Sequence, residues 1–196
     1  MIHIIDKIID VPLNNRFGAY LSGAYRTVDD QNGIAADHLL VYLNLVARPC
    51  FLRINSACFT GDLFGDNRCD CNWQLTFTLD LIQQNQQGLL IYHLHHDGRG
   101  NGTVQKLRAF QSRLAQLENP PKIPDYMPDA RRFQSTIAIL KDLGVDSVNL
   151  ISNNPKKARI LIEAGIEVKA MTPIISDSPL LREYYKAKMR DFNVHA

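Results

Sequence analysis

Three of the four cysteines in this 196-residue chain lie within one short segment, and they constrain the local fold more than any other feature. They are Cys58, Cys69 and Cys71, in the segment CFTGDLFGDNRCDC. Thiolates are soft ligands that suit zinc; structural zinc usually takes four protein ligands, whereas catalytic zinc takes three. The three cysteines therefore predict a loop that folds around a catalytic zinc ion and leaves one position for water.

Two alternatives stay open for these cysteines. They could be reduced core residues without a metal, or they could recruit Cys50 into a closed four-cysteine site. If residues 51–56 form a strand, Cys50 shares one face with Leu52 and Ile54, because alternate residues of a strand point the same way. That pattern predicts a core position for Cys50.

Composition places the chain among ordinary globular proteins. Hydrophobic residues make up 45% of it, and the formal net charge is +2. A charge this small predicts neither nucleic acid nor a membrane surface as a partner. The start of the chain carries acids and asparagines where a signal peptide needs an apolar run, and no apolar stretch approaches the roughly 20 residues of a membrane helix. We therefore expect a cytoplasmic location with reduced cysteines.

The order of the expected elements indicates a mixed α/β (α+β) fold in a single domain over residues 1–196. Residues 1–57 have mainly strand patterns, so the first half is strand-rich and carries the predicted zinc site. Residues 72–87 fit a strand or a helix, and their length and the following Gly88 favour the helix. Helix and strand then alternate, with strands expected at 89–94, 147–151 and 166–170 and helices at 104–117, 133–143, 155–164 and 180–192.

Three polar segments lie beside expected helices, and the first two are candidates for anion binding. The glycine-rich segment 97–102 precedes a helix, where backbone amides favour an anion, although an ordinary turn fits the pattern better. Lys156 and Lys157 lie in a first helical turn, which the helix dipole disfavours; either a bound anion offsets them or they are solvated. Asp129 and Arg131, taken alone, indicate only a solvated helix start.

A cluster of histidines follows the strand expected at 89–94. His93 and His95 would project from one face of that strand, with His96 beside them. One interpretation is a second metal site, and the other is a polar lining of a pocket.

Taken together, these residues resemble GTP cyclohydrolase II, the enzyme family that opens the riboflavin pathway. The most specific part is the pattern C-x10-C-x-C followed by Gln74, and residues 53–71, 98–109, 152–157 and 163–166 also match. The resemblance implies a GTP cyclohydrolase II-like fold, a homodimer and GTP or a related purine nucleotide as the substrate.

The resemblance also implies roles for individual residues. Cys58, Cys69 and Cys71 would hold catalytic Zn2+, and two hydrolytic steps at the guanine ring would release formate. Arg131 would attack the α-phosphate and expel pyrophosphate, with Asp129 as its base and Mg2+ on the phosphates. The product would be 2,5-diamino-6-(5-phosphoribosylamino)pyrimidin-4-one. The nucleotide would be bound by Arg53, Asn55, Ser56, Gln74, Asp97, Gly98, Arg99, Ser152 and Lys157.

The chain departs from the family pattern around the reacting ring. Asn55 and Ala57 stand where the usual R-V-H-S-E has His and Glu, Asp97 replaces a Glu, and Phe110 replaces a Tyr. The usual G-Y-D-T segment gives way to the proline-rich residues 118–128. Alternative functions are therefore an enzyme that stops at the formamidopyrimidine intermediate or accepts another purine nucleotide, a non-catalytic nucleotide-binding regulator, and a zinc-stabilised interaction module.

Overall fold

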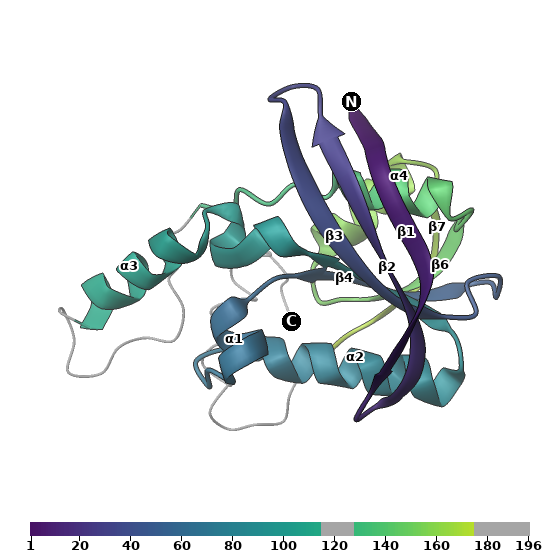
Figure 1. Cartoon of the computed structure of the whole chain (residues 1–196), viewed down its shortest axis with the longest axis horizontal. Coiled ribbons are helices and arrows are strands. Elements are labelled where there is room, and N and C mark those ends of the chain that lie inside the picture. The colour runs from purple at the N-terminus through teal and green to yellow at the C-terminus, as the bar shows by residue number, and fades with distance from the viewer. Residues whose placement is uncertain (115–127, 175–196) are drawn as a thin grey trace.

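The central feature of the fold is a mixed sheet, seen in a computed structural model that describes residues 1–114 and 128–174 (Figure 1). In these residues the sheet has seven strands in the order β1-β2-β3-β5-β4-β6-β7. The strands are β1 Ile2–Asn15, β2 Gly18–Asp29, β3 Ile34–Leu43, β4 Cys50–Ser56, β5 Gly88–His93, β6 Ser147–Ile151 and β7 Glu167–Thr172.

The helices complete the mixed α/β fold that the sequence predicts. They are α1 Phe59–Phe64, α2 Cys71–Asn85, the 3-10 helix η1 Leu94–Gly100, α3 Thr103–Leu114, α4 Gln134–Asp142 and α5 Pro155–Glu163. The ambiguous segment 72–87 is thus a helix, and the alternation of helix and strand in the second half is confirmed. The helix expected at 180–192 and most of the proline-rich segment 118–128 lie outside the described residues. In the described part of the chain, no helix has the length and apolar character needed to cross a membrane.

The strand pairing in the sheet changes from antiparallel to parallel at β5. Strands β1, β2 and β3 form an antiparallel meander, and β3 also pairs antiparallel with β5. From β5 onwards the pairs β5–β4, β4–β6 and β6–β7 are all parallel. The carboxyl ends of β4, β5 and β6 therefore meet at one edge, which is where ligands bind in open α/β sheets.

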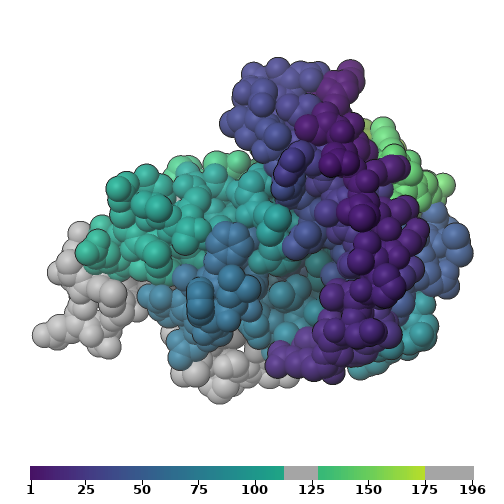
Figure 2. Space-filling view, viewed as in Figure 1, coloured from purple at the N-terminus to yellow at the C-terminus, as the bar shows by residue number. Residues whose placement is uncertain are grey.

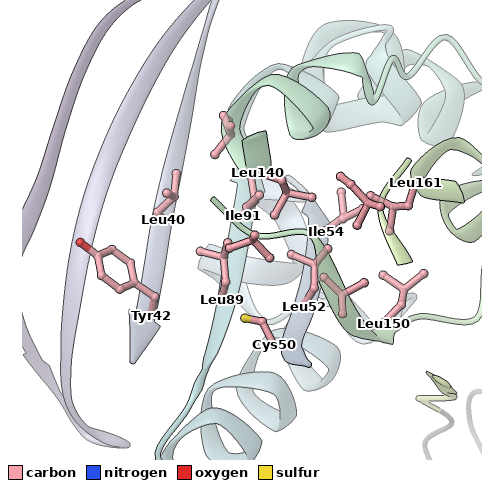
Figure 3. Close-up of a cluster of buried hydrophobic side chains, with 14 of the residues drawn as sticks. Leu40, Tyr42, Cys50, Leu52, Ile54, Leu89, Ile91, Leu140, Leu150 and Leu161 are labelled. Atoms are coloured by element: carbon pink, nitrogen blue, oxygen red, sulfur yellow. The ribbon is translucent and has the colours of Figure 1, made fainter. Parts of the chain in front are cut away.

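Apolar side chains pack on both faces of the sheet. On one face, Leu79 and Ile82 of α2 pack with Tyr20 and Leu90. On the other face, α4 and α5 cover a larger cluster that includes the strand residues of Figure 3. Full burial of one such aliphatic side chain contributes about 1.5–3 kcal/mol, so this larger cluster is the main stabilising element.

Cys50 belongs to that larger cluster, as its strand position predicts. Its side chain is fully buried, and Figure 3 places it near Leu52 and Leu89. Burial raises the pKa of its thiol to about 11, so the residue stays a neutral core cysteine. It is not among the cysteines whose sulfur atoms converge, and the closed four-cysteine alternative is thereby wrong.

The outer strand β1 lies along the surface, where Figure 2 shows it in purple on one side of the visible face. The hydroxyl of Tyr25 in β2 donates to Asp142 at the end of α4 at 2.6 Å. Lys7 of β1 forms an ion pair with the same carboxylate at 2.7 Å. These contacts join the antiparallel strands to a helix that covers the parallel half.

The start of α5 follows the sequence prediction closely. Asn154 is the N-cap, and its side-chain oxygen accepts a hydrogen bond from the backbone N–H of Lys156 at 3.0 Å. Pro155 occupies the first helical turn, where its missing N–H costs nothing. After the helix, Gly165 adopts a φ of +82°, which a residue with a side chain rarely adopts.

Candidate metal and nucleotide site

The three clustered cysteines meet just beyond the carboxyl end of β4. Cys58 follows β4 by two residues, Cys69 lies in the turn before α2, and Cys71 is the first residue of α2. Their sulfur atoms all lie within 4.8 Å of one another, and the Cys58 and Cys69 sulfurs are 3.7 Å apart. Two sulfurs bound to one tetrahedral zinc ion at about 2.3 Å would be roughly 3.8 Å apart. The geometry and the soft donors therefore fit zinc.

A glycine makes this convergence possible. A Cβ atom at Gly61 in α1 would lie 2.7 Å from the Cys69 sulfur and 3.2 Å from the Cys58 sulfur. It would also lie 3.1 Å from the Cβ of Cys71. All three contacts are shorter than side chains normally make, so the cysteine cluster requires glycine at this position.

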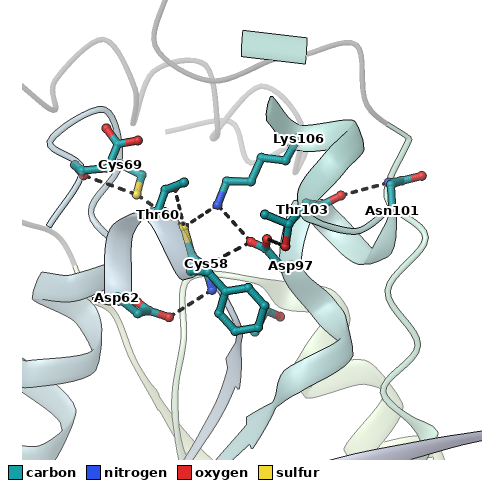
Figure 4. Close-up of polar contacts among 12 residues, drawn as sticks. Cys58, Thr60, Asp62, Cys69, Asp97, Asn101, Thr103 and Lys106 are labelled. Carbon is teal, nitrogen blue, oxygen red and sulfur yellow. Dashed lines mark hydrogen bonds and ion pairs between the residues drawn. The ribbon is translucent and has the colours of Figure 1, made fainter. Parts of the chain in front are cut away.

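A buried lysine lies between the cysteines and a carboxylate (Figure 4). The ammonium group of Lys106 donates to the sulfur of Cys58 at 3.1 Å and to the Oδ1 atom of Asp97 at 2.9 Å. Asp97 is held in turn by the hydroxyl of Thr103, which donates to its Oδ2 atom at 2.6 Å. Lys106 and Asp97 are 8% and 2% exposed, so this ion pair is poorly screened by solvent.

The lysine supports a thiolate at Cys58. Hydrogen bonds with Cys69 and Cys71, with the charge of Lys106, lower the pKa of Cys58, although burial acts the other way. Burial would lower the pKa of Lys106, but Cys58 and Asp97 raise it, so the ammonium keeps its proton. A thiolate is the form that binds a metal ion.

No local sequence pattern marks Lys106 as a site residue, and α3 shows why. The spacing of apolar residues predicts a helix there, which is confirmed, but Val104 and Leu107 on its apolar stripe are 61% and 47% exposed. The face that α3 buries carries Lys106 and Ala109 instead. A lysine three residues before an alanine is a weak signal, since the same pattern is common on solvated helices.

Asp62 of α1 is a second site residue that no sequence motif indicates. Its Oδ2 atom accepts hydrogen bonds from the backbone N–H of Cys58 at 3.0 Å and from the hydroxyl of Tyr92 at 2.6 Å. Burial raises the pKa of its carboxyl to about 6. The side chain positions the backbone of the first cysteine against β5.

Asp129 and Arg131 lie on a segment without regular secondary structure, not in the helix start that their sequence indicates, because α4 begins only at Gln134. The backbone N–H of Ala130 donates to the carbonyl of Arg99 at 2.9 Å, which ties this segment to the glycine-rich loop. A Cβ at Gly100 would lie 3.0–3.2 Å from the backbone of Ala130 and Arg131, so a glycine is needed at this close approach.

The side chains of Asp129 and Arg131 form a bidentate ion pair. The guanidinium Nη2 atom lies 2.6 Å from Oδ2 and its Nε atom 2.8 Å from Oδ1. Burial would raise the pKa of Asp129, but the hydrogen bonds and charge of Arg131 outweigh it and hold the pKa at about 2, with a smaller effect from Arg99. The Nη1 atom of Arg131 also donates to the hydroxyl of Ser56, at 3.4 Å.

Three of the predicted nucleotide-binding residues are bonded to one another at the carboxyl half of β4. Arg53 donates to the Oε1 atom of Gln74 at 2.6 Å and to the Oδ1 atom of Asn55 at 3.1 Å. The amide nitrogen of Gln74 donates to Asp70. Arg53, Asn55 and Gln74 are all buried, so their donors and acceptors are held in fixed positions.

The predicted residues after β6 lie at the same edge. Lys157 is 5% exposed, and its ammonium donates to the carbonyl of Ile54 in β4 at 2.7 Å. It also lies 5.2 Å from the ring centre of Phe133. The hydroxyl of Ser152 accepts from the backbone N–H of Asn154 at 3.0 Å. Lys156, by contrast, is exposed, in agreement with the alternative that this lysine is solvated.

The positions that depart from the family pattern lie close to the cysteines. Ala57 is 4% exposed, and its backbone N–H donates to the carbonyl of His93 at 3.1 Å. The ring of Phe110 lies 4.2 Å from the guanidinium carbon of Arg68, the neighbour of Cys69. Asp97, as described, holds Lys106.

The fold and the site together define a mixed α/β protein with a three-cysteine cluster at the carboxyl edge of its parallel strands. A family model described as GTP cyclohydrolase II matches residues 6–173. The chain therefore belongs to the GTP cyclohydrolase II family.

Named relatives agree with that assignment. "Riboflavin biosynthesis protein RibBA" of Aquifex aeolicus is 32% identical over 192 residues, covering 94% of this chain and 46% of the relative. "GTP cyclohydrolase-2" of Streptomyces coelicolor is 34% identical over 173 residues, covering 87% of this chain and 77% of the relative. "GTP cyclohydrolase-2" of Xylella fastidiosa is 38% identical over 148 residues, covering 72% of this chain and 37% of the relative. The chain thus spans less than half the length of the first and third relatives.

Proposed function

We propose that this protein is a zinc-dependent hydrolase that opens the imidazole ring of GTP and releases formate and pyrophosphate. The product would be 2,5-diamino-6-(5-phosphoribosylamino)pyrimidin-4-one. The observation that carries the proposal is the convergence of three cysteine sulfurs, with the 3.7 Å spacing between Cys58 and Cys69, at the sheet edge where the predicted nucleotide-binding residues also lie. Family membership supports the reaction class.

Cys58, Cys69 and Cys71 would hold the zinc ion. When bound, zinc supplies a Lewis acid and lowers the pKa of a coordinated water towards neutrality. Three thiolates and one divalent ion leave a net negative charge, which the ammonium of Lys106 offsets at 3.1 Å from Cys58. Asp97 keeps that ammonium in place.

Arg53 and Gln74 would recognise the guanine base. The Oε1 atom of Gln74 accepts from Arg53 and its amide donates to Asp70, so the orientation of the amide group is set before a ligand binds. The carbonyl oxygen of the amide has a second lone pair, which can accept a hydrogen bond from an N–H group of guanine. Asn55 completes this group through its bond to Arg53.

Basic side chains and glycine amides would bind the phosphates, with Mg2+ as their counterion. Lys157 and Ser152 stand at the start of α5, where the helix favours an anion. Gly98 and Arg99 both have positive φ, 60° and 56°, which turns the backbone of the glycine-rich loop sharply. Arg131 would act on the α-phosphate, and the Asp129 carboxylate orients its guanidinium.

The reaction is tested by incubating the zinc-loaded protein with GTP and Mg2+ and measuring the products by mass, with formate and pyrophosphate assayed separately. We expect one formate and one pyrophosphate for each GTP consumed. Tight GTP binding without any product would overturn the proposal in favour of a non-catalytic regulator. A parallel incubation with other purine nucleotides distinguishes the alternative substrate.

A second candidate is an enzyme that stops at the formamidopyrimidine intermediate. Ala57, the first residue after β4 and the neighbour of Cys58, brings no carboxylate to the metal site, and Phe110 brings no hydroxyl. The second hydrolysis would therefore lack two polar groups that the family pattern supplies. Ring-opened product that retains the formyl group, without free formate, would favour this candidate.

Arg131→Ala is expected to lower pyrophosphate release by about 100-fold or more, since a charged donor that acts on a transferring phosphate has an effect of this order. Zinc content should stay unchanged, because Arg131 contacts Asp129 and Ser56 but none of the cysteines. The two quantities are measured by a pyrophosphate assay and by metal analysis of the same preparation.

Arg132→Ala is the matched control for that variant. Arg132 is the next residue and is also paired, with Asp29 at 2.6 Å, but its side chain is 54% exposed. It should release pyrophosphate at nearly the normal rate. Equal losses in the two variants, or full activity in Arg131→Ala, would remove Arg131 from the proposed phosphate chemistry.

Two further proposals concern assembly, which rests on the family resemblance alone, and location, which rests on the composition of the sequence. We propose that the protein is a homodimer and that it acts in the cytoplasm. Sedimentation of the purified protein measures the first, and a sedimentation coefficient of a monomer over the working concentration range would contradict it. Fractionation of cells measures the second.

A further inference from the structure

A second group of converging side chains lies outside the cysteine cluster. His38 of β3 pairs directly with His93 of β5 across the antiparallel ladder, and His95 follows in η1. One ring nitrogen from each of these three residues lies within 4.8 Å of the other two. We call them the three-histidine cluster.

The two buried members face each other through the same kind of nitrogen. The Nδ1 atoms of His38 and His93 are 2.8 Å apart. The opposite nitrogens, both Nε2, contact hydroxyl groups: Thr27 at 2.9 Å from His38 and Thr136 at 2.8 Å from His93. Two lone pairs cannot face each other at this distance without a proton or a cation between them.

This arrangement matches what metal-binding histidines need around them. A histidine that binds a metal through one ring nitrogen almost always uses its other nitrogen in a hydrogen bond that fixes the ring. Thr27 and Thr136 are 2% and 0% exposed, so the hydroxyls that hold the two rings are themselves fixed. The two Nδ1 atoms are thereby held 2.8 Å from each other.

We propose that His38, His93 and His95 form a second metal site, for a divalent transition-metal ion. With metal–nitrogen bonds of about 2.1 Å, nitrogens 2.8 Å apart would subtend roughly a right angle at the ion. A right angle belongs to tetragonal or octahedral coordination, which imidazoles provide for Ni2+ and Cu2+, whereas zinc usually prefers a tetrahedral angle. The cluster would therefore take a different ion from the thiolates.

Burial suits the three-histidine cluster to this role. His38 and His93 are fully buried, whereas His95 is exposed and opens the site to entering ions and to water as further ligands. Burial lowers the pKa of His38 to about 4 and that of His93 well below its usual value, so both rings are neutral at pH 7. A neutral imidazole is the form that binds metal.

The adjacent His96 is not a fourth ligand. Its ring stacks on His93 with centres 4.6 Å apart, but its Nδ1 atom contacts Ser56 at 3.2 Å and its Nε2 atom contacts the carbonyl of Arg132 at 2.9 Å. Ser56 in turn accepts from Arg131. An ion in the three-histidine cluster would therefore fix β3, β5 and η1 directly beside the segment that carries Arg131.

The test counts Ni2+ ions bound by untagged, chelator-treated, reduced protein, using calorimetric titration and metal analysis after gel filtration. Wild type should bind two equivalents, one of them at the thiolates. His95→Ala should bind one, and its exposed side chain makes loss of folding improbable, which circular dichroism checks. Cys69→Ser should also keep one equivalent, without the sulfur-to-nickel charge-transfer band of the thiolate site.

His3→Ala is the matched control, because His3 is exposed, lies on β1 away from the three-histidine cluster, and its ring is hydrogen-bonded to Asp30 at 2.7 Å. It should bind two equivalents like wild type. If wild type and His95→Ala bind the same number of Ni2+ ions, the cluster is a hydrogen-bonded one and the proposal is overturned. Because the readout is a metal count, it does not depend on turnover of GTP.

Discussion

Gly61→Ala is expected to abolish stoichiometric zinc binding at the cysteine cluster. The added methyl group would lie 2.7 Å from the Cys69 sulfur and 3.2 Å from the Cys58 sulfur, so at least one of them must move away. Displacing a ligand by this amount should weaken metal affinity by about 100-fold or more, since even changes beyond the ligands cost 10–100-fold. Ring opening of GTP should be lost with the metal.

The measurement is zinc content after dialysis against a chelator of graded strength. Helix propensity cannot explain a loss of zinc, because Gly61 lies within α1 and alanine is more favourable than glycine in a helix by roughly 1 kcal/mol. Leu63→Ala in the same helix is the control, since Leu63 is 69% exposed and should retain zinc as wild type does. Undiminished zinc affinity in Gly61→Ala would contradict the cluster as the metal site.

Lys106→Met should destabilise the protein by about 3–5 kcal/mol, the usual cost of removing one partner of a buried ion pair. The side chains of Lys106 and Asp97 are only 10% and 3% exposed, so little of this is lost to solvent screening. The variant would leave Asp97 buried without its cation and would take the positive charge away from Cys58. Zinc affinity should fall as well, because the thiolates lose the group that offsets their charge.

Denaturant unfolding measures the loss of stability. Lys156→Met is the control, because it makes the same substitution at an exposed lysine. A double variant, Lys106→Met with Asp97→Asn, shows how much of the loss of stability comes from the unpaired Asp97 carboxylate. If the loss comes from the unpaired carboxylate, adding Asp97→Asn should recover part of the stability. An unfolding midpoint equal to that of wild type in Lys106→Met would show that the ion pair contributes nothing.

Local patterns in the sequence were sufficient for most of the fold. The strand-rich first half, the helix at 72–87 and the cap at Asn154 each depend on residues close to one another, and the structure has them. The segment of Asp129 and Arg131 is the exception. Its side chains bind each other, and its backbone pairs with Arg99 in a distant loop, a tertiary contact that outweighs any local preference for a helix.

The site was predictable only where its residues are local. Cys58, Cys69 and Cys71 are close in sequence, so the sequence predicts their convergence. The glycine-rich loop is predictable for the same reason. Lys106 reaches Cys58 across 48 positions and lies on a helix whose apolar stripe faces solvent. His38 joins His93 only through the register of β3 against β5, and strand register between distant segments is not visible in one sequence.

The cysteine cluster has a consequence for how the protein would acquire and lose a metal ion. All three sulfurs belong to one 14-residue stretch outside the sheet, and closing so short a loop costs little conformational entropy. The two apolar clusters that hold the sheet to its helices include none of these three cysteines. A metal ion held by these sulfurs would therefore leave and return when the segment between β4 and α2, which includes α1, opens, while the sheet stays folded.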